Sequence, residues 1–303
     1  MLIGHQKQWG LLEKMAQSNR APHALIFSGE EGLGKKEIVL DFFQFFSNGD
    51  FKNHPDLMVI ESPKKEIVID QIRDLQKFLS YTKQIAKYKF VIINQAERLN
   101  IEAQNCLLKT LEEPSVDSIL ILVTSLPQQL AKTILSRCQE IKFYPLSFDI
   151  MEKALSDYKD RANFQEVLAM AGGRPRHALE LFNNEQILKK QINNLQIANE
   201  LAKSDLVMRF LLIKDYFSKS EKEEAFEEIS QFLQDSIFYW RFFLQKKLGI
   251  AKPFANLYTK AILENYPISR IATILEKIEE LQFLFLTSNI NKRLLLENLI
   301  LNL

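Results

Sequence analysis

A glycine-rich loop near the start of the sequence carries the residues best suited to chemistry. Residues 29–36 read GEEGLGKK. The positions that define the pattern are Gly29, Gly34 and Lys35, and Gly32 between them is a further candidate for the phosphate site. Glycines let successive backbone N–H groups turn toward phosphate oxygens, and the lysine neutralises phosphate charge. The next residue in such loops is Ser or Thr, whose hydroxyl is a ligand of Mg²⁺, but here it is Lys36. Because an ammonium cannot bind a metal, the loop predicts a phosphate site without its metal ligand.

Two amides stand where a P-loop ATPase needs two acids. Asn94 and Gln95 follow the apolar run 90–93. In a working ATPase an Asp at this strand end holds the Mg²⁺ shell, and a Glu orients or deprotonates the attacking water. Amides keep roughly the size of these acids but carry no charge. Positions 36 and 94 thus lack the two usual ligands of Mg²⁺, and position 95 lacks the base that acts on the water. The sequence therefore predicts a chain that does not hydrolyse ATP on its own.

Other interpretations of these two segments stay open. The loop could be a glycine-rich turn that matches by chance, and residues 90–95 could be a buried strand with a polar end. Neither explains why the polar end falls two elements after a phosphate-type loop. Lys35 can still bind phosphate without Mg²⁺, so binding of ATP or ADP without turnover stays open. We expect no required cofactor and no metal.

The elements that must position these residues are strands alternating with helical segments. Runs that are apolar throughout suit strands covered on both faces, and the helical segments between them are the crossovers that a parallel sheet needs. The strand-like runs are 23–28, 57–60, 89–93, 119–124 and 140–143. The glycine-rich loop lies between the first run and a helical stretch, 36–46. The sequence therefore predicts an α/β domain with a five-stranded parallel sheet over residues 1–146.

Beyond Pro145 the strand-like runs stop and amphipathic helical patterns follow. A short helical domain is expected over 147–186, with helices near 150–156, 164–171 and 175–182. An all-α domain is expected over 187–303. Its aromatic run, 238–243, is interpreted as helix packing rather than as a platform for stacking bases.

Composition narrows the class of protein further. The chain has 303 residues, 39 Lys plus Arg, 38 Asp plus Glu and a net charge of +1, so no global field draws it to nucleic acid. With 47% hydrophobic residues it is expected to be a globular, multidomain protein. Its two cysteines and the absence of a signal-like N-terminus favour a reducing cytoplasm.

The segment after the amides resembles the clamp-loader branch of the AAA+ family. Residues 103–114 read AQNCLLKTLEEP, close to the wording of the helix that follows the Walker B strand in that branch. The triplet Ser136-Arg137-Cys138 is the most telling match. Further matches in the right order are 23–27 (HALIF), 54–56 (HPD), 69–73 (IDQIR), 121–125 (ILVTS) and 172–179 (GGRPRHAL). The resemblance covers about residues 3–182 and is to the bacterial DNA polymerase III loader.

This resemblance implies a fold and a role. Residues 1–146 would be an AAA+ RecA-like α/β P-loop domain, 147–186 its helical lid, and 187–303 a helical collar for oligomerisation. The losses at Lys36, Asn94 and Gln95 favour a non-hydrolysing subunit over the gamma/tau motor subunit. Arg137 would then be an arginine finger that acts in trans on ATP bound to a neighbour, because a planar guanidinium can pair with two phosphate oxygens.

Further expectations follow from the same resemblance. Arg176 falls at the sensor-2 position of the lid, where it would contact either a bound nucleotide or an acidic neighbour. Many relatives carry four cysteines of a zinc module in the stretch 47–53, which has none here, so no zinc is predicted. Expected partners in this hetero-oligomer for DNA replication are the gamma/tau and delta subunits, with the sliding clamp and primer-template DNA reached through the assembly. No membrane is expected.

Two alternative functions stay open at this point. The chain could be a catalytically active AAA+ ATPase of the motor type in which Lys36 and Asn94 are tolerated. It could also be a P-loop phosphotransferase, which would need a Mg²⁺ ligand and a substrate base that the sequence does not reveal.

Overall fold

Five parallel strands form the single sheet of the α/β part. The computed structural model describes residues 4–17, 22–47, 51, 53–62, 66–218, 224–250, 264–287 and 291–303. The sheet order is β2-β3-β4-β1-β5, and every pairing is parallel. The strands are β1 (Ala24–Ser28), β2 (Leu57–Ile60), β3 (Lys89–Asn94), β4 (Ser118–Thr124) and β5 (Gln139–Lys142). The predicted five-stranded parallel sheet is confirmed, with boundaries that differ by one residue or less at every strand end.

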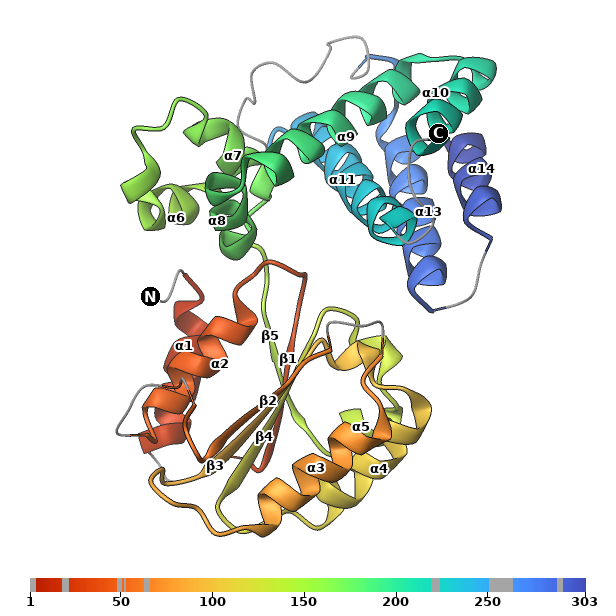
Figure 1. Cartoon of the computed structure of the whole chain (residues 1–303). Helices are drawn as coiled ribbons and strands as arrows, with labels where there is room; N and C mark the ends of the chain where they lie inside the picture. Colours follow the sequence, from red (N-terminus) through yellow and green to blue (C-terminus); the bar gives the residue numbers. More distant parts are fainter. Residues whose placement is uncertain are drawn as a thin grey trace. The chain divides into compact units, whose positions relative to one another are not determined.

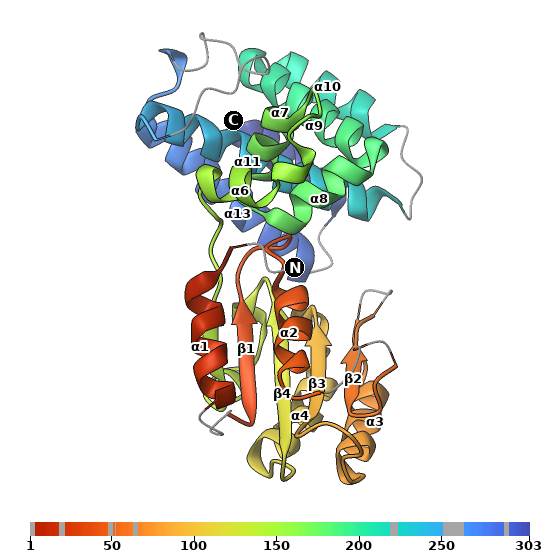
Figure 2. The same ribbon diagram turned by 90° about the vertical axis from the view of Figure 1, so that its left-hand side faces the viewer.

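Helices cover both faces of this sheet, as Figures 1 and 2 show. On one face lie α1 (Gln6–Gln17) and α2 (Lys35–Gln44), and on the other α3 (Ile69–Ser80), α4 (Ile101–Glu112) and α5 (Lys132–Leu135). Short 3₁₀ turns follow β3 and β4 at η1 (Ala96–Arg98) and η2 (Pro127–Gln129). Both faces of the central strands β1, β3 and β4 are covered, which is why these strands read as continuous apolar runs, whereas only Ile141 of the edge strand β5 is buried.

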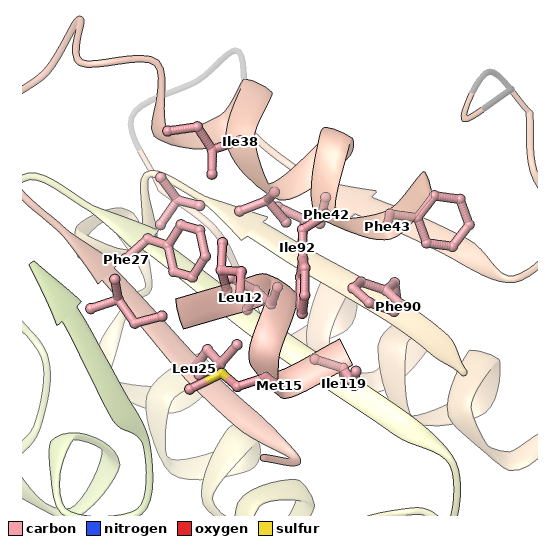
Figure 3. Close-up of a cluster of buried hydrophobic side chains, with 14 of the residues drawn as sticks. Leu12, Met15, Leu25, Phe27, Ile38, Phe42, Phe43, Phe90, Ile92 and Ile119 are labelled. Atoms are coloured by element: carbon pink, nitrogen blue, oxygen red, sulfur yellow. The ribbon is translucent and has the colours of Figure 1, made fainter. Parts of the chain in front are cut away.

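Alternate residues of each strand enter two separate hydrophobic cores. Leu25 and Phe27 of β1 join the cluster under α1 and α2, whereas Ala24 and Ile26 join the one under α3, α4 and α5. Figure 3 shows the first cluster, in which phenylalanines of α2 pack against Phe90 of β3. Burial on both faces holds the strands in one register, because a slip by one residue would exchange the two sets.

Asp56 fixes the loop that leads into β3. Its side chain is fully buried and accepts hydrogen bonds from the backbone N–H groups of Gln84, Ile85 and Ala86 at 2.8, 2.7 and 2.8 Å. Burial alone would raise the pKa of Asp56, but these three donors outweigh it and hold the pKa below its ordinary value. The motif at residues 54–56 therefore has a structural role in this chain.

The described residues after β5 form helices joined by short connections, as predicted. The lid-type helices are α6 (Phe148–Ala154), with η3 (Ser156–Tyr158) after it, α7 (Phe164–Ala171) and α8 (Pro175–Asn183). The later helices are α9 (Glu185–Lys203), α10 (Leu206–Ser218), α11 (Glu224–Lys247), α13 (Ile268–Thr287) and α14 (Lys292–Asn302). The chain divides into two compact units, Met1–Asp160 with Ala171–Leu179, and Arg161–Met170 with Glu180–Leu303. The predicted three-domain division stays a prediction.

Aromatic residues and one polar cluster lie inside the second unit. Tyr239, Trp240 and Phe243 of α11 are at most 1% exposed, which confirms that this run packs between helices. Buried Asn194 of α9 donates to Asp235 of α11 at 2.7 Å and accepts from the hydroxyl of Tyr216 of α10. Pairing satisfies these buried polar groups.

The described residues contain neither a membrane-spanning helix nor a metal-binding cluster of side chains. No described helix combines the length and the apolar character needed to cross a membrane. No three His, Cys, Asp or Glu side chains within the described part are grouped so that they could hold a metal ion. Within the stretch 47–53, which contains no cysteine, residues 48–50 and 52 lie outside the described residues. The absence of zinc stays a prediction.

Candidate functional site

The glycine-rich loop has the backbone that the sequence predicts. It follows β1 and ends where α2 begins, with φ of +144° at Gly29, +81° at Gly32 and +83° at Gly34. These values strongly favour glycine. At Gly32 a Cβ would also come within 2.9 Å of the Cβ of His177, so the close approach of the α8 segment requires a glycine there.

Lys35 is turned into the loop rather than out of it. Its side chain is 6% exposed, and Nζ donates to the carbonyl oxygens of Gly29 at 2.5 Å and Glu30 at 2.7 Å. Burial lowers its pKa to about 8, against the opposing charges of Glu97 and other nearby carboxylates. Lys35 therefore stabilises the loop by donating to two of the loop's carbonyl oxygens.

Lys36 and Asn94 converge on a carboxylate that the sequence analysis missed. Lys36 Nζ lies 2.6 Å from Oε2 of Glu61, and Asn94 Nδ2 donates to the same oxygen at 3.3 Å. The hydrogen bond from Lys36 lowers the pKa of Glu61 below its ordinary value. Glu61 is the first residue after β2, which pairs with β3, so the order of the strands brings it beside Asn94. The two positions that normally serve Mg²⁺ thus share one carboxylate, which Lys36 contacts by an ion pair and Asn94 by a hydrogen bond.

A second carboxylate that sequence reasoning missed lies near Lys35. Oε1 of Glu97 accepts from the hydroxyl of Ser125 at 2.6 Å and from its N–H at 3.3 Å. Oε2 of Glu97 is buried and has no hydrogen-bond partner among the described atoms. Gln95 lies two residues earlier, at the turn into η1, with φ of +54°. Of the carboxylates whose charge acts on Lys35, Glu97 has the largest effect, and it stands two residues after the amide Gln95.

The start of α8 is held directly on the glycine-rich loop. The backbone N–H groups of Arg176 and His177 donate to the carbonyl of Gly32 at 2.9 and 3.3 Å. The side chain of Arg176 lies 3.5 Å from Oε1 of Glu37 in the first turn of α2. Of the two contacts expected for Arg176, the structure contains the acidic neighbour. Its role toward nucleotide stays a prediction.

Arg137 and the glycine-rich loop lie at opposite ends of the parallel strands. The loop follows the carboxyl end of β1, whereas Arg137 precedes the amino end of β5, and Ser28 pairs with Lys142. The five residues from Lys142 back to Arg137 span about 15 Å at the rise of a strand. The geometry therefore separates Arg137 from the loop of its own chain.

Arg137 is exposed and held by neighbouring groups. Its Nη2 lies 2.8 Å from Oε1 of Glu112 at the end of α4, and Nη1 donates to the carbonyl of Thr133 at 3.1 Å. Cys138 beside it is largely buried, which raises the pKa of its thiol to about 12 and makes it a poor nucleophile. Of this triplet, Ser136 and Arg137 are exposed, and the arginine alone carries a charge.

The fold and site together define an AAA+ P-loop protein: a parallel sheet in the order β2-β3-β4-β1-β5, a glycine-rich loop after β1 and helical lid and collar segments after β5. The sequence model of the family described as "DNA polymerase III, delta subunit" matches residues 4–147. The subunit delta' of Pseudomonas aeruginosa is 32% identical, over 70% of this chain and 73% of that protein. The delta' subunit of Bacillus subtilis is 29% identical, over 72% and 71%.

The chain belongs to the family of DNA polymerase III delta' subunits. The DNA polymerase III subunit tau of Bacillus subtilis is also similar, at 27% identity over 79% of this chain and 48% of that protein. The resemblance to clamp-loader AAA+ subunits inferred from the sequence is confirmed at the level of the family.

The lowered pKa of Lys35 predicts a pH-dependent stability. The folded chain releases this proton near pH 8, whereas an unfolded chain holds it up to the ordinary value of 10.5. Between these values the unfolded state binds more protons, so the free energy of unfolding rises with pH, by about 1–3 kcal/mol in all. Urea unfolding of the wild type and Lys35→Met measures it: the wild type should gain on the variant from pH 8 to 10.5. A pH-independent difference would contradict the assignment.

Proposed function

We propose that this chain is a non-hydrolysing AAA+ subunit of the replicative clamp loader, which helps to load the sliding clamp onto primed DNA. The observation that carries the proposal is the contact of one carboxylate, Glu61, with both Lys36 and Asn94. A P-loop ATPase needs Mg²⁺ to bridge the β- and γ-phosphates and to neutralise developing charge. Here a covalently attached ammonium lies beside the carboxylate, and the hydroxyl ligand and the acidic strand end are both missing. Membership of the delta' family supports the proposal.

Arg137 would supply the chemistry that this chain lacks. Its exposure and its place at the amino edge of β5 support an action in trans on ATP bound to a neighbouring subunit. A guanidinium can stabilise the charge that develops on the γ-phosphoryl group, an effect of about 10³ to 10⁵ in rate for fingers of this kind. The subunit would govern hydrolysis next door without hydrolysing ATP itself.

Expected partners are the gamma/tau and delta subunits, with the sliding clamp and primer-template DNA reached through the assembly, all in the cytoplasm. Several apolar side chains of α10 are well exposed and support a use of the helical region in oligomerisation: Leu206, Val207, Met208 and Leu211. Exposed apolar groups concentrated on one helix are typical of an interaction surface. ATP or ADP binding without hydrolysis remains compatible with Lys35, and no cofactor is required.

Glu97 favours a second candidate, an active motor-type ATPase. Its carboxylate is held by Ser125, just beyond the end of β4, and its charge acts on Lys35. A carboxylate in this region is what activation of a water requires. The second candidate still lacks the hydroxyl and the acid that bind Mg²⁺, so we rank it below the first.

Hydrolysis by the purified chain separates these two functions. We expect no turnover of Mg²⁺-ATP above that of Lys35→Ala, because no Mg²⁺ ligand is present at position 36 or 94. The assay is steady-state phosphate release. Turnover that exceeds this background and is lost in Glu97→Gln would establish the second candidate instead.

Replacement of Arg137 tests the proposed action in trans. In an assembly reconstituted with the motor and delta subunits, Arg137→Ala should slow the one hydrolytic site that it serves by about 10³. Single-turnover kinetics with clamp and primed DNA would then lack one fast phase. The matched control is Arg73→Ala on α3, an exposed arginine that pairs with Asp70. If all fast phases survive in Arg137→Ala, the finger hypothesis is wrong.

A further inference from the structure

Arg137 is held by three contacts from two segments. Nη2 meets Oε1 of Glu112 at 2.8 Å, while Nη1 donates to the carbonyl of Thr133 at 3.1 Å and lies 3.5 Å from the hydroxyl of Ser136. Together the contacts involve both terminal nitrogens of the guanidinium. Among the described residues none accepts from Nε, so that nitrogen remains available to a ligand.

Both anchors stand on firmly packed elements. Glu112 directly follows Leu111, which is 3% exposed and packs with Leu107 in the core under α3, α4 and α5. Thr133 precedes Ile134, which is fully buried in the same core. The carboxylate and the carbonyl are therefore fixed relative to each other by core packing and define one place for the guanidinium.

An exposed arginine without such anchors would sample many rotamers. Its side chain is long and loses much conformational freedom when a phosphate captures it. The carboxylate of Glu112 reduces this loss in advance. An arginine has five N–H donors, so it can keep Glu112 and still present donors to phosphate oxygens.

We propose that Glu112 is a positioning residue for Arg137, which keeps the guanidinium oriented for the polyphosphate of a nucleotide bound to a neighbouring subunit. The inference rests on the proposed function of Arg137 in trans. Glu112 thus has a role in addition to its place as the last residue of α4. Glu112 itself touches no reacting atom in this proposal, and its effect passes entirely through Arg137.

The test compares variants in the reconstituted assembly with clamp and primed DNA. Glu112→Gln should lower kcat at the site served by Arg137 roughly 3- to 10-fold, with KM for ATP unchanged, because the guanidinium is less often in place. The matched control is Glu113→Gln, the exposed neighbouring glutamate, which should behave as wild type. Added to Arg137→Ala, Glu112→Gln should cause no further loss.

Each outcome is distinct. A wild-type rate in Glu112→Gln, with the rate lost in Arg137→Ala, overturns the positioning role and leaves the finger in place. A further loss in the double variant, or a lower melting temperature in Glu112→Gln alone, shows a merely structural role and also overturns it. A wild-type rate in Arg137→Ala instead overturns the proposed function itself.

Discussion

The polarity of the parallel sheet is the constraint on which the rest of this structure depends. All five strands run in the same direction. The glycine-rich loop, Glu61 and Asn94 therefore lie together at the carboxyl ends of the strands, whereas Arg137 lies at the amino end of β5. One fold thus presents a phosphate-type loop and an exposed guanidinium on opposite edges. A chain built in this way can receive a ligand at one edge and offer a charge at the other, which is the arrangement that a series of subunits needs.

The two lysines at the carboxyl ends of the strands have hydrogen-bond or ion-pair partners within the chain. Lys35 is satisfied by two loop carbonyls, Lys36 by Glu61, and the start of α8 is held by the carbonyl of Gly32. In P-loop ATPases a bound nucleotide and Mg²⁺ supply such partners. Here both lysines have partners within the chain itself. The architecture of a P-loop protein is therefore compatible with internal partners for these two lysines.

The sequence predicted the fold well because fully apolar runs mark strands buried on both faces. Lys36, Asn94 and Arg137 stood out along the sequence, since each departs from or matches a short local pattern, and the roles predicted for them stay predictions. It could not identify Glu61, because the contact depends on β2 lying beside β3, and strand order is not visible along the chain. Glu112 and Glu37 were missed for the same reason: helix packing decides their partners. For Glu61 a signal existed, an acid directly after a strand of a parallel sheet.

We infer that the ammonium of Lys36 takes the place of a Mg²⁺ ion beside Glu61. Electron paramagnetic resonance of Mn²⁺ with ATP, recorded with and without the purified chain, tests it most directly. The account predicts that the spectrum of Mn²⁺-ATP stays that of the free complex, while Lys36→Thr combined with Asn94→Asp produces a protein-bound signal. A protein-bound Mn²⁺-ATP signal with the wild-type chain would contradict it.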